Sequence, residues 1–156
     1  MSKDSFAALV RQVTDVIAGK PVDAGLAAFL NDTFPEDSPL FRAIEAAILQ
    51  GAAEGWVCER EHGGIRYGRV LKADESLSGF SVDVVHMSDL AGPHHRHPGG
   101  EIDMILPVTT GASFDGAPRG WLAYGPDSAH RPTVTGGAAY VLYLLPGGEI
   151  EFTRAA

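Results

Sequence analysis

The sequence is poor in cysteine, in positive charge and in long apolar runs. Its single cysteine, Cys58, cannot form an intramolecular disulfide, which excludes a disulfide-stapled secreted scaffold and favours a cytoplasmic location. No run approaches the roughly 18 apolar residues of a membrane-spanning helix, so we expect no membrane partner. Charges at Lys3 and Asp4 also interrupt the N-terminus too early for a secretory signal.

Positive charge is scarce along the whole chain. The 12 Lys and Arg face 20 Asp and Glu, giving a net charge of −8. Residues 1–54 carry four basic against eight acidic side chains, and residues 55–156 carry eight against twelve. A nucleic-acid-binding surface needs clustered basic side chains to neutralise phosphates. We therefore expect no nucleic acid as a partner. Phosphate-binding P-loop and nucleophile-elbow motifs are absent as well.

The spacing of apolar residues changes near residue 55. Before it, apolar residues recur every three or four positions, which predicts helices, and Ser38-Pro39 is a good start for one of them. These helices either cover a core made elsewhere or form a dimerisation arm. After it, short alternating runs separated by Gly and Pro are typical of strands in a sandwich or barrel. The candidate strands are WVCER, IRYGRVL, FSVDVVHM, EIDMILPV, SFDG, GWLAY, AAYVLYLL and EIEFT. We predict a helical N-terminal extension over residues 1–54 and an antiparallel β-barrel over residues 55–156.

Metal-ligand residue types gather in the stretch HHRHPGGE and recur about thirty residues later. His95 and His97 are two apart, so an extended backbone points both the same way. Glu101 follows a Pro-Gly-Gly that can bend the chain, and His130 follows a Gly-Pro-Asp turn signal. Three imidazoles and one carboxylate are good ligands for a divalent transition metal, although ordinary polar loop histidines are the alternative. Nitrogen and oxygen donors do not choose among iron, manganese, nickel, copper and zinc.

The two segments resemble the paired signature motifs of the cupin superfamily. The first family motif has the form H-x-H-x(3,4)-E and the second P-x-G-x-x-H. The resemblance spans residues 65–153 and implies a cupin-type barrel, also called a double-stranded β-helix or jelly roll. It places His95, His97, Glu101 and His130 at the family's metal-ligand positions. The chain departs from the pattern at Gly125 and Asp127, where Pro and Gly are usual, and in the glycines that flank the first motif (Gly92, Gly111).

A narrower resemblance is carried by HPGGEIDMILPV, GASFDG and GWLAYGPDSAHRPTVTGGAAYVLYLLPGGEIEF, together with the helical N-terminal region. These segments are similar to the 4-hydroxylaminobenzoate lyase family. That resemblance implies conversion of a small aromatic acid, 4-hydroxylaminobenzoate, to protocatechuate and ammonia. Cupin resemblance also implies a homo-oligomer, a dimer or larger. The alternatives are a non-haem iron dioxygenase acting on a small phenolic compound and a non-enzymatic cupin that binds a small ligand.

Two residues are candidates for acid–base catalysis. The period of two along EIDMIL places Asp103 on the same face as Glu101, toward the barrel interior. A buried carboxyl group there is either a general acid or base or a structural partner that orients a ligand histidine. His94 is either a proton shuttle at the mouth of the site or an exposed loop residue.

Other side chains are candidates for binding the substrate. The period of two along FSVDVVHM places His86 on the same face as Val84. His86 therefore either lines the cavity or caps the end of its strand at the surface, and we expect it to line the cavity. Arg131 could bind an aromatic carboxylate in bidentate fashion, although alternation with His130 favours a surface position equally. Tyr124 could supply an aromatic wall or belong to the core. Arg66 and Arg69 are weaker candidates on an earlier strand.

Overall fold

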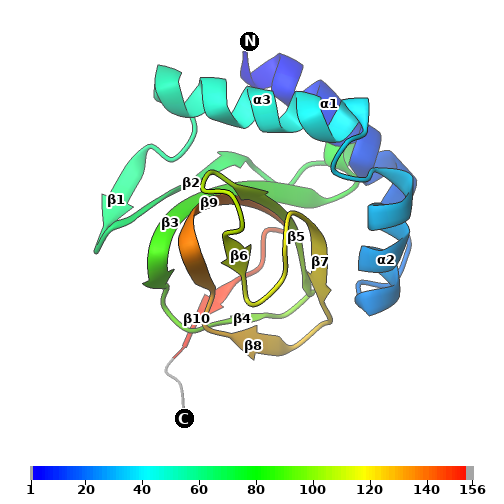
Figure 1. The fold of residues 1–156 in the computed structure, drawn as a ribbon. Coiled ribbons are helices and arrows are strands. Elements are labelled where there is room, and N and C mark those ends of the chain that lie inside the picture. The colour runs from blue at the N-terminus through cyan, green and yellow to red at the C-terminus, as the bar shows by residue number, and fades with distance from the viewer. Residues whose placement is uncertain (1, 154–156) are drawn as a thin grey trace.

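The computed structural model describes residues 2–153, in which three N-terminal helices precede strands arranged as two sheets (Figure 1). The helices are α1 (Lys3–Ile17), α2 (Ala24–Thr33) and α3 (Pro39–Glu54), and a 3-10 turn, η1, covers Glu75–Leu77. The strands are β1 (Arg60–His62), β2 (Ile65–Leu71), β3 (Phe80–Ala91), β4 (His95–His97), β5 (Glu101–Pro107), β6 (Ser113–Phe114), β7 (Gly120–Tyr124), β8 (Ser128–His130), β9 (Thr133–Pro146) and β10 (Glu151–Phe152).

The larger, seven-stranded sheet has the order β1-β2-β3-β9-β5-β7, with β6 paired to β9, and the smaller sheet has the order β10-β4-β8. All of the strand pairs that make up these sheets are antiparallel. In Figure 1 the smaller sheet closes the side of the rounded β body opposite α3. The predicted mainly β, cupin-type jelly roll is therefore confirmed. Its two sheets are not joined edge to edge into one closed hydrogen-bonded barrel.

The helices pack on the outer face of the larger sheet. Ser38 and Asp23 cap α3 and α2 by accepting hydrogen bonds from backbone N–H groups, as polar N-cap residues do. Apolar side chains from all three helices share one core with strands β2, β3, β5, β7 and β9. The helices thus cover a core, the first of the two predicted roles. The helices and the strands share this core. The division of the chain into an extension over residues 1–54 and a barrel over residues 55–156 stays a prediction.

Strand β5 separates this core from the space between the sheets. Ile102, Met104 and Leu106 face the helices and belong to the shared core. Ile105 packs in a second apolar cluster on the opposite face, the face that also carries Glu101 and Asp103. All these side chains are buried. One face of β5 therefore packs on the helices, and the other holds two carboxyl groups in a space from which water is excluded. The predicted alternation along this strand is confirmed.

Two short strands were missing from the sequence prediction. β4 and β8, each three residues long, carry the histidines, and at that length neither produces a detectable period of two. The predicted strand WVCER is wrong for its first residues: Trp56–Cys58 form bends, and only Arg60 enters β1. Cys58 has a φ of +56°, which is incompatible with a strand. Within residues 2–153, no helix has both the length and the apolarity required to cross a membrane.

We expect Asn31→Ala to lower the free energy of unfolding by about 1–2 kcal/mol. Its side-chain amide spans from α2 to β7, donating to the backbone carbonyl of Trp121 (3.0 Å) and accepting from the N–H of the same residue (2.9 Å). Urea denaturation followed by tryptophan fluorescence measures the loss. Asp32→Ala, an exposed change on the same helix, is the control and should leave the midpoint in place. Equal midpoints for both variants would contradict this role of Asn31.

Candidate metal centre and adjoining cavity

The predicted metal ligands come together between the two sheets. His95 and His97 lie on β4, and His130 lies on β8 with its Cα directly opposite that of His95. Glu101 begins β5 in the larger sheet. The turn between β4 and β5 passes through Gly100 at a φ of +92°, where an added Cβ would lie 2.8 Å from a backbone oxygen. The Pro-Gly-Gly stretch therefore performs the chain reversal that its composition predicted.

The four side chains present their ligand atoms to one small volume. Atoms Nε2 of His95 and of His97 lie 3.2 and 3.3 Å from Oε1 of Glu101. Nε2 of His130 lies 3.3 Å from Oε2 of Glu101 and 3.0 Å from Nε2 of His95. All four ligand atoms fall within 4.8 Å of one another. Such a set of three imidazoles and one carboxylate is able to hold a divalent transition-metal ion.

Two buried atoms of this cluster support that fit. Among the described residues, Nε2 of His97 and Oε2 of Glu101 have no hydrogen-bond partner, although both side chains are fully buried. A buried polar atom without a partner costs free energy, so native proteins rarely leave one unexplained. An ion at the centre of the cluster would give both atoms a partner. The donor set and these unpaired atoms therefore fit a metal.

The carboxylate of Asp115, which no sequence motif marks, orients one residue of the cluster, His130. Oδ2 of Asp115 accepts hydrogen bonds from Nδ1 of His130 (2.5 Å) and from the hydroxyl of Tyr124 (2.6 Å). Its Oδ1 accepts from the backbone N–H of Thr133 (2.9 Å). These bonds fix the orientation of His130 and leave Nε2 pointing at the cluster, as carboxylates beside metal-binding histidines commonly do. The available signal was the Asp-Gly pair in SFDG, which was interpreted only as the end of a strand.

Neighbouring charged groups offset the effect of burial on two members of the cluster, Glu101 and His130. Burial alone would raise the pKa of Glu101, but the imidazoles of His130, His95 and His97, whose nitrogens lie 3.2–3.3 Å from its oxygens, hold that pKa well below its usual range. Burial alone would lower the pKa of His130, but its bonds to Asp115 and Glu101 raise it to about 9. Glu101 is thus a carboxylate at neutral pH, which is the form that binds a metal.

Tyr124 lies against the cluster, as part of its wall. Its ring stacks on that of His97, with centroids 5.7 Å apart, and lies 4.4 Å from that of His130. Tyr124 does not line the cavity described below. A direct contact with substrate stays a prediction, whereas its packing against two of the histidines is a structural fact.

Asp103 is completely buried on the interior face of β5. Neither of its carboxyl oxygens has a hydrogen-bond partner among residues 2–153. Burial, followed by repulsion from Glu101, raises its pKa well above the usual range. Asp103 does not line the cavity, so its predicted role in acid–base catalysis stays a prediction.

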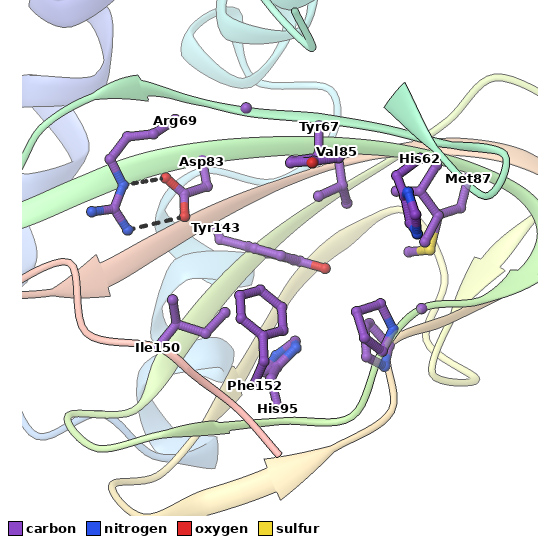
Figure 2. Close-up of a pocket in the computed structure, with 15 residues that line it drawn as sticks. His62, Tyr67, Arg69, Asp83, Val85, Met87, His95, Tyr143, Ile150 and Phe152 are labelled. Carbon is purple, nitrogen blue, oxygen red and sulfur yellow. Dashed lines mark hydrogen bonds and ion pairs between the residues drawn. The ribbon is translucent and has the colours of Figure 1, made fainter. Parts of the chain in front are cut away.

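A cavity of about 420 Å³ adjoins the cluster of metal-ligand residues (Figure 2). Among the four ligand residues, His95 is the one that lines it. The walls are mostly apolar, formed by Ile65, Val85, Met87, Ile150 and Phe152. Arg69 and Asp83 form an ion pair at one end (Nε to Oδ1, 2.7 Å), as Figure 2 shows. The hydroxyl of Tyr143 points toward the middle of the cavity.

The predicted cavity-lining position of His86 is wrong. On β3, the residues that line the cavity are Asp83, Val85 and Met87, so alternation turns His86 to the opposite face. Its ring packs there on Tyr140, with centroids 4.7 Å apart. Val84 and His86 share a face, as the alternation predicts, but that face is the one toward the helices.

Two further candidates also lie outside the cavity lining. The guanidinium of Arg131 donates to the backbone carbonyl of Gly92 (3.2 Å), and its side chain is exposed. Nδ1 of His94 lies 2.6 Å from the hydroxyl of Thr153. Neither residue is among those that line the cavity. The structure thus favours the surface interpretation of Arg131, and a catalytic role for His94 stays a prediction.

Comparison with known proteins places this site in a family. Residues 8–152 match the family model described as PnbB, 4-hydroxylaminobenzoate lyase. A curated 4-hydroxylaminobenzoate lyase of Nocardioides sp. (strain LMS-CY) is 36% identical over 137 residues, covering 81% of this chain and 80% of the relative. A second protein of that name, from Pseudomonas putida, is 29% identical over 153 residues, covering 87% of each chain.

A solved structure of an RmlC-like cupin protein from Ralstonia eutropha JMP134 is also similar to this chain. Its TM-score is 0.43 at 14% sequence identity, over 60% of this chain and 66% of that one. The family model, in contrast, spans nearly the whole chain and includes all four residues of the metal cluster. The chain belongs to the 4-hydroxylaminobenzoate lyase family.

Proposed function

We propose that this protein is a metal-dependent lyase that converts 4-hydroxylaminobenzoate to protocatechuate and ammonia. The observation that carries the proposal is that the cluster of His95, His97, Glu101 and His130 adjoins an apolar cavity, with His95 in the cavity wall. Such a cavity is suited to a planar aromatic ring, because most small-ligand sites combine apolar walls with a few placed polar groups. The identity of the proposed substrate comes from the two relatives, which are named as lyases of this aromatic acid.

The residues of the cluster would hold one divalent transition-metal ion. Such an ion would supply a Lewis acid and make hydroxide available near neutral pH. The protein's own contribution is to keep Glu101 charged and to aim His130 through Asp115. It also removes bulk water, because His95, His97 and Glu101 are each at most 2% exposed.

The overall reaction needs no oxidant. One water is consumed and one ammonia is released. Reduction of the nitrogen, as its N–O bond breaks, balances the oxidation of the ring carbon that gains a hydroxyl group. The cavity therefore has to admit water to the ring near His95 while the apolar walls hold the ring in place. This balance separates a lyase from a dioxygenase, in which molecular oxygen supplies the oxygen atoms.

Arg69 is the candidate partner for the substrate carboxylate. It brings a fixed positive charge to the lining of the cavity, the role that the sequence analysis considered for Arg131. Its Nε and Nη2 bond the carboxylate of Asp83, and Nη2 also donates to the carbonyl of Gly148. Among the described residues these bonds leave Nη1 as the nitrogen that can still donate, and in Figure 2 it lies on the side of the guanidinium away from Asp83 and Tyr143. Asp83 and Gly148 hold the guanidinium in place, so little side-chain entropy is lost on binding.

We expect the purified protein to release ammonia from 4-hydroxylaminobenzoate at the same rate with and without oxygen. The physical reason is the redox balance within the substrate. Ammonium assays run in parallel with an oxygen electrode measure both quantities. Oxygen uptake in step with turnover would contradict the lyase and support the dioxygenase instead.

We expect the paired change Arg69→Gln with Asp83→Asn to raise KM for 4-hydroxylaminobenzoate about tenfold or more, with a smaller effect on kcat. A hydrogen bond to a charged group contributes about 1.5–3 kcal/mol, and changing both residues avoids leaving Asp83 as an unpaired anion. Arg66→Gln is the matched control, because Arg66 lies on the same strand but bonds Tyr140 on the opposite face. Steady-state kinetics decide the matter, and a KM within threefold of the parent value would refute this role of Arg69.

A further inference from the structure

The hydroxyl of Tyr143 is a polar group inside an otherwise apolar part of the cavity. Tyr143 lies on β9 and is 4% exposed, with its ring centroid 6.2 Å from that of the ligand residue His95. Figure 2 shows the hydroxyl pointing into the cavity. Within residues 2–153 no protein group forms a hydrogen bond with it, and it is not one of the fully enclosed atoms without a partner, because it borders the cavity. Water or a ligand in that space therefore provides its hydrogen-bond partner.

The two carboxylates nearest to Tyr143 in the sheet do not form hydrogen bonds with its hydroxyl. Across the larger sheet, its Cα lies opposite those of Asp83 on β3 and Asp103 on β5. Both carboxyl oxygens of Asp83 are bonded to Arg69. Asp103 has no hydrogen-bond partner among the described residues, so it does not bond Tyr143 either. The tyrosine hydroxyl is thus available to a molecule in the cavity.

The ion pair of Arg69 and Asp83 marks one end of the cavity. Under the proposed function, the Arg69 guanidinium binds the substrate carboxylate at that end. The Tyr143 hydroxyl is directed away from Arg69, toward the middle of the cavity (Figure 2), and the Tyr143 ring lies beside His95. A ring whose carboxylate is at Arg69 therefore directs its opposite, para substituent toward the tyrosine hydroxyl and the metal cluster.

We propose that the Tyr143 hydroxyl forms a hydrogen bond with the substituent para to the substrate carboxylate, so that this residue selects aromatic acids that carry a polar group there. The inference rests on the proposed function for the orientation of the ring. It goes further by assigning recognition of the reacting end to one side chain. A site built to hydrogen-bond a substituent discriminates against analogues that lack it, because its own polar group is then left without a partner.

Tyr140 provides a matched control on the same strand. It lies three residues before Tyr143 and faces the helices, where its hydroxyl accepts a hydrogen bond from Arg66 (3.3 Å). Tyr140→Phe and Tyr143→Phe remove the same atom from opposite faces of β9. A purely structural effect of losing a tyrosine hydroxyl should therefore appear in both variants, whereas a change in ligand preference should appear only in Tyr143→Phe.

The experiment is calorimetric titration of the metal-loaded protein with 4-hydroxybenzoate and with benzoate, which differ only in the para hydroxyl. We expect the parent and Tyr140→Phe to bind 4-hydroxybenzoate roughly 3–10-fold more tightly than benzoate, as one neutral hydrogen bond allows. Tyr143→Phe should lose this preference, keep its affinity for benzoate and keep its metal content.

Two results would overturn the inference: a preference that survives in Tyr143→Phe, or failure of the parent to bind either probe. Because binding is measured without turnover, the outcome is separable from that of the proposed function. Ammonia release together with an unchanged preference in Tyr143→Phe would sink the inference alone. If Tyr143→Phe loses the preference but the parent protein releases no ammonia, the inference is supported and the lyase proposal is contradicted.

Discussion

The site depends on keeping the carboxylate of Glu101 charged in the interior. Burying a carboxylate costs several kcal/mol unless charge and hydrogen bonds compensate for the lost water. Three imidazoles provide that compensation, and they lie on the smaller sheet, whereas Glu101 lies on the larger one. The ionic cluster therefore links the two sheets, which share no strand. A metal ion at this position would strengthen the same link, since it would bind residues of both sheets.

The rest of the architecture protects or orients this cluster. The helices seal the outer face of the larger sheet, so that β5 can carry apolar side chains on one face and Glu101 and Asp103 on the other. Asp115 fixes His130 from behind, and the cavity approaches the cluster from the side of His95. Besides His62, Tyr67 and His95, the polar side chains that line the cavity are the pair of Arg69 and Asp83 at one end and Tyr143, whose ring lies beside His95. This arrangement restricts the orientations available to an aromatic acid.

The sequence was sufficient for features that depend on local pattern. Helical periodicity, the Ser38-Pro39 start of α3 and the alternation along EIDMIL depend on neighbouring residues, and the four clustered ligand residues also have a recognisable spacing. The sequence did not predict which face of a strand packs on the helices and which faces the space between the sheets. Alternation put His86 on one face of β3 with Val84, but it could not tell that this face meets the helices. Asp115 approaches His130 only through the pairing of β6 with β9, which no local pattern encodes.

The most direct test of the account is the metal content of the purified protein, measured by elemental analysis beside a variant carrying His97→Ala and His130→Ala. We expect near-stoichiometric iron, manganese, nickel, copper or zinc in the parent and almost none in the variant, because the variant retains only His95 and Glu101 as ligands. A circular dichroism spectrum of the variant checks that it has folded. A parent that holds no metal after reconstitution with each of these ions would contradict the account, and the cluster would then be a hydrogen-bonded polar core.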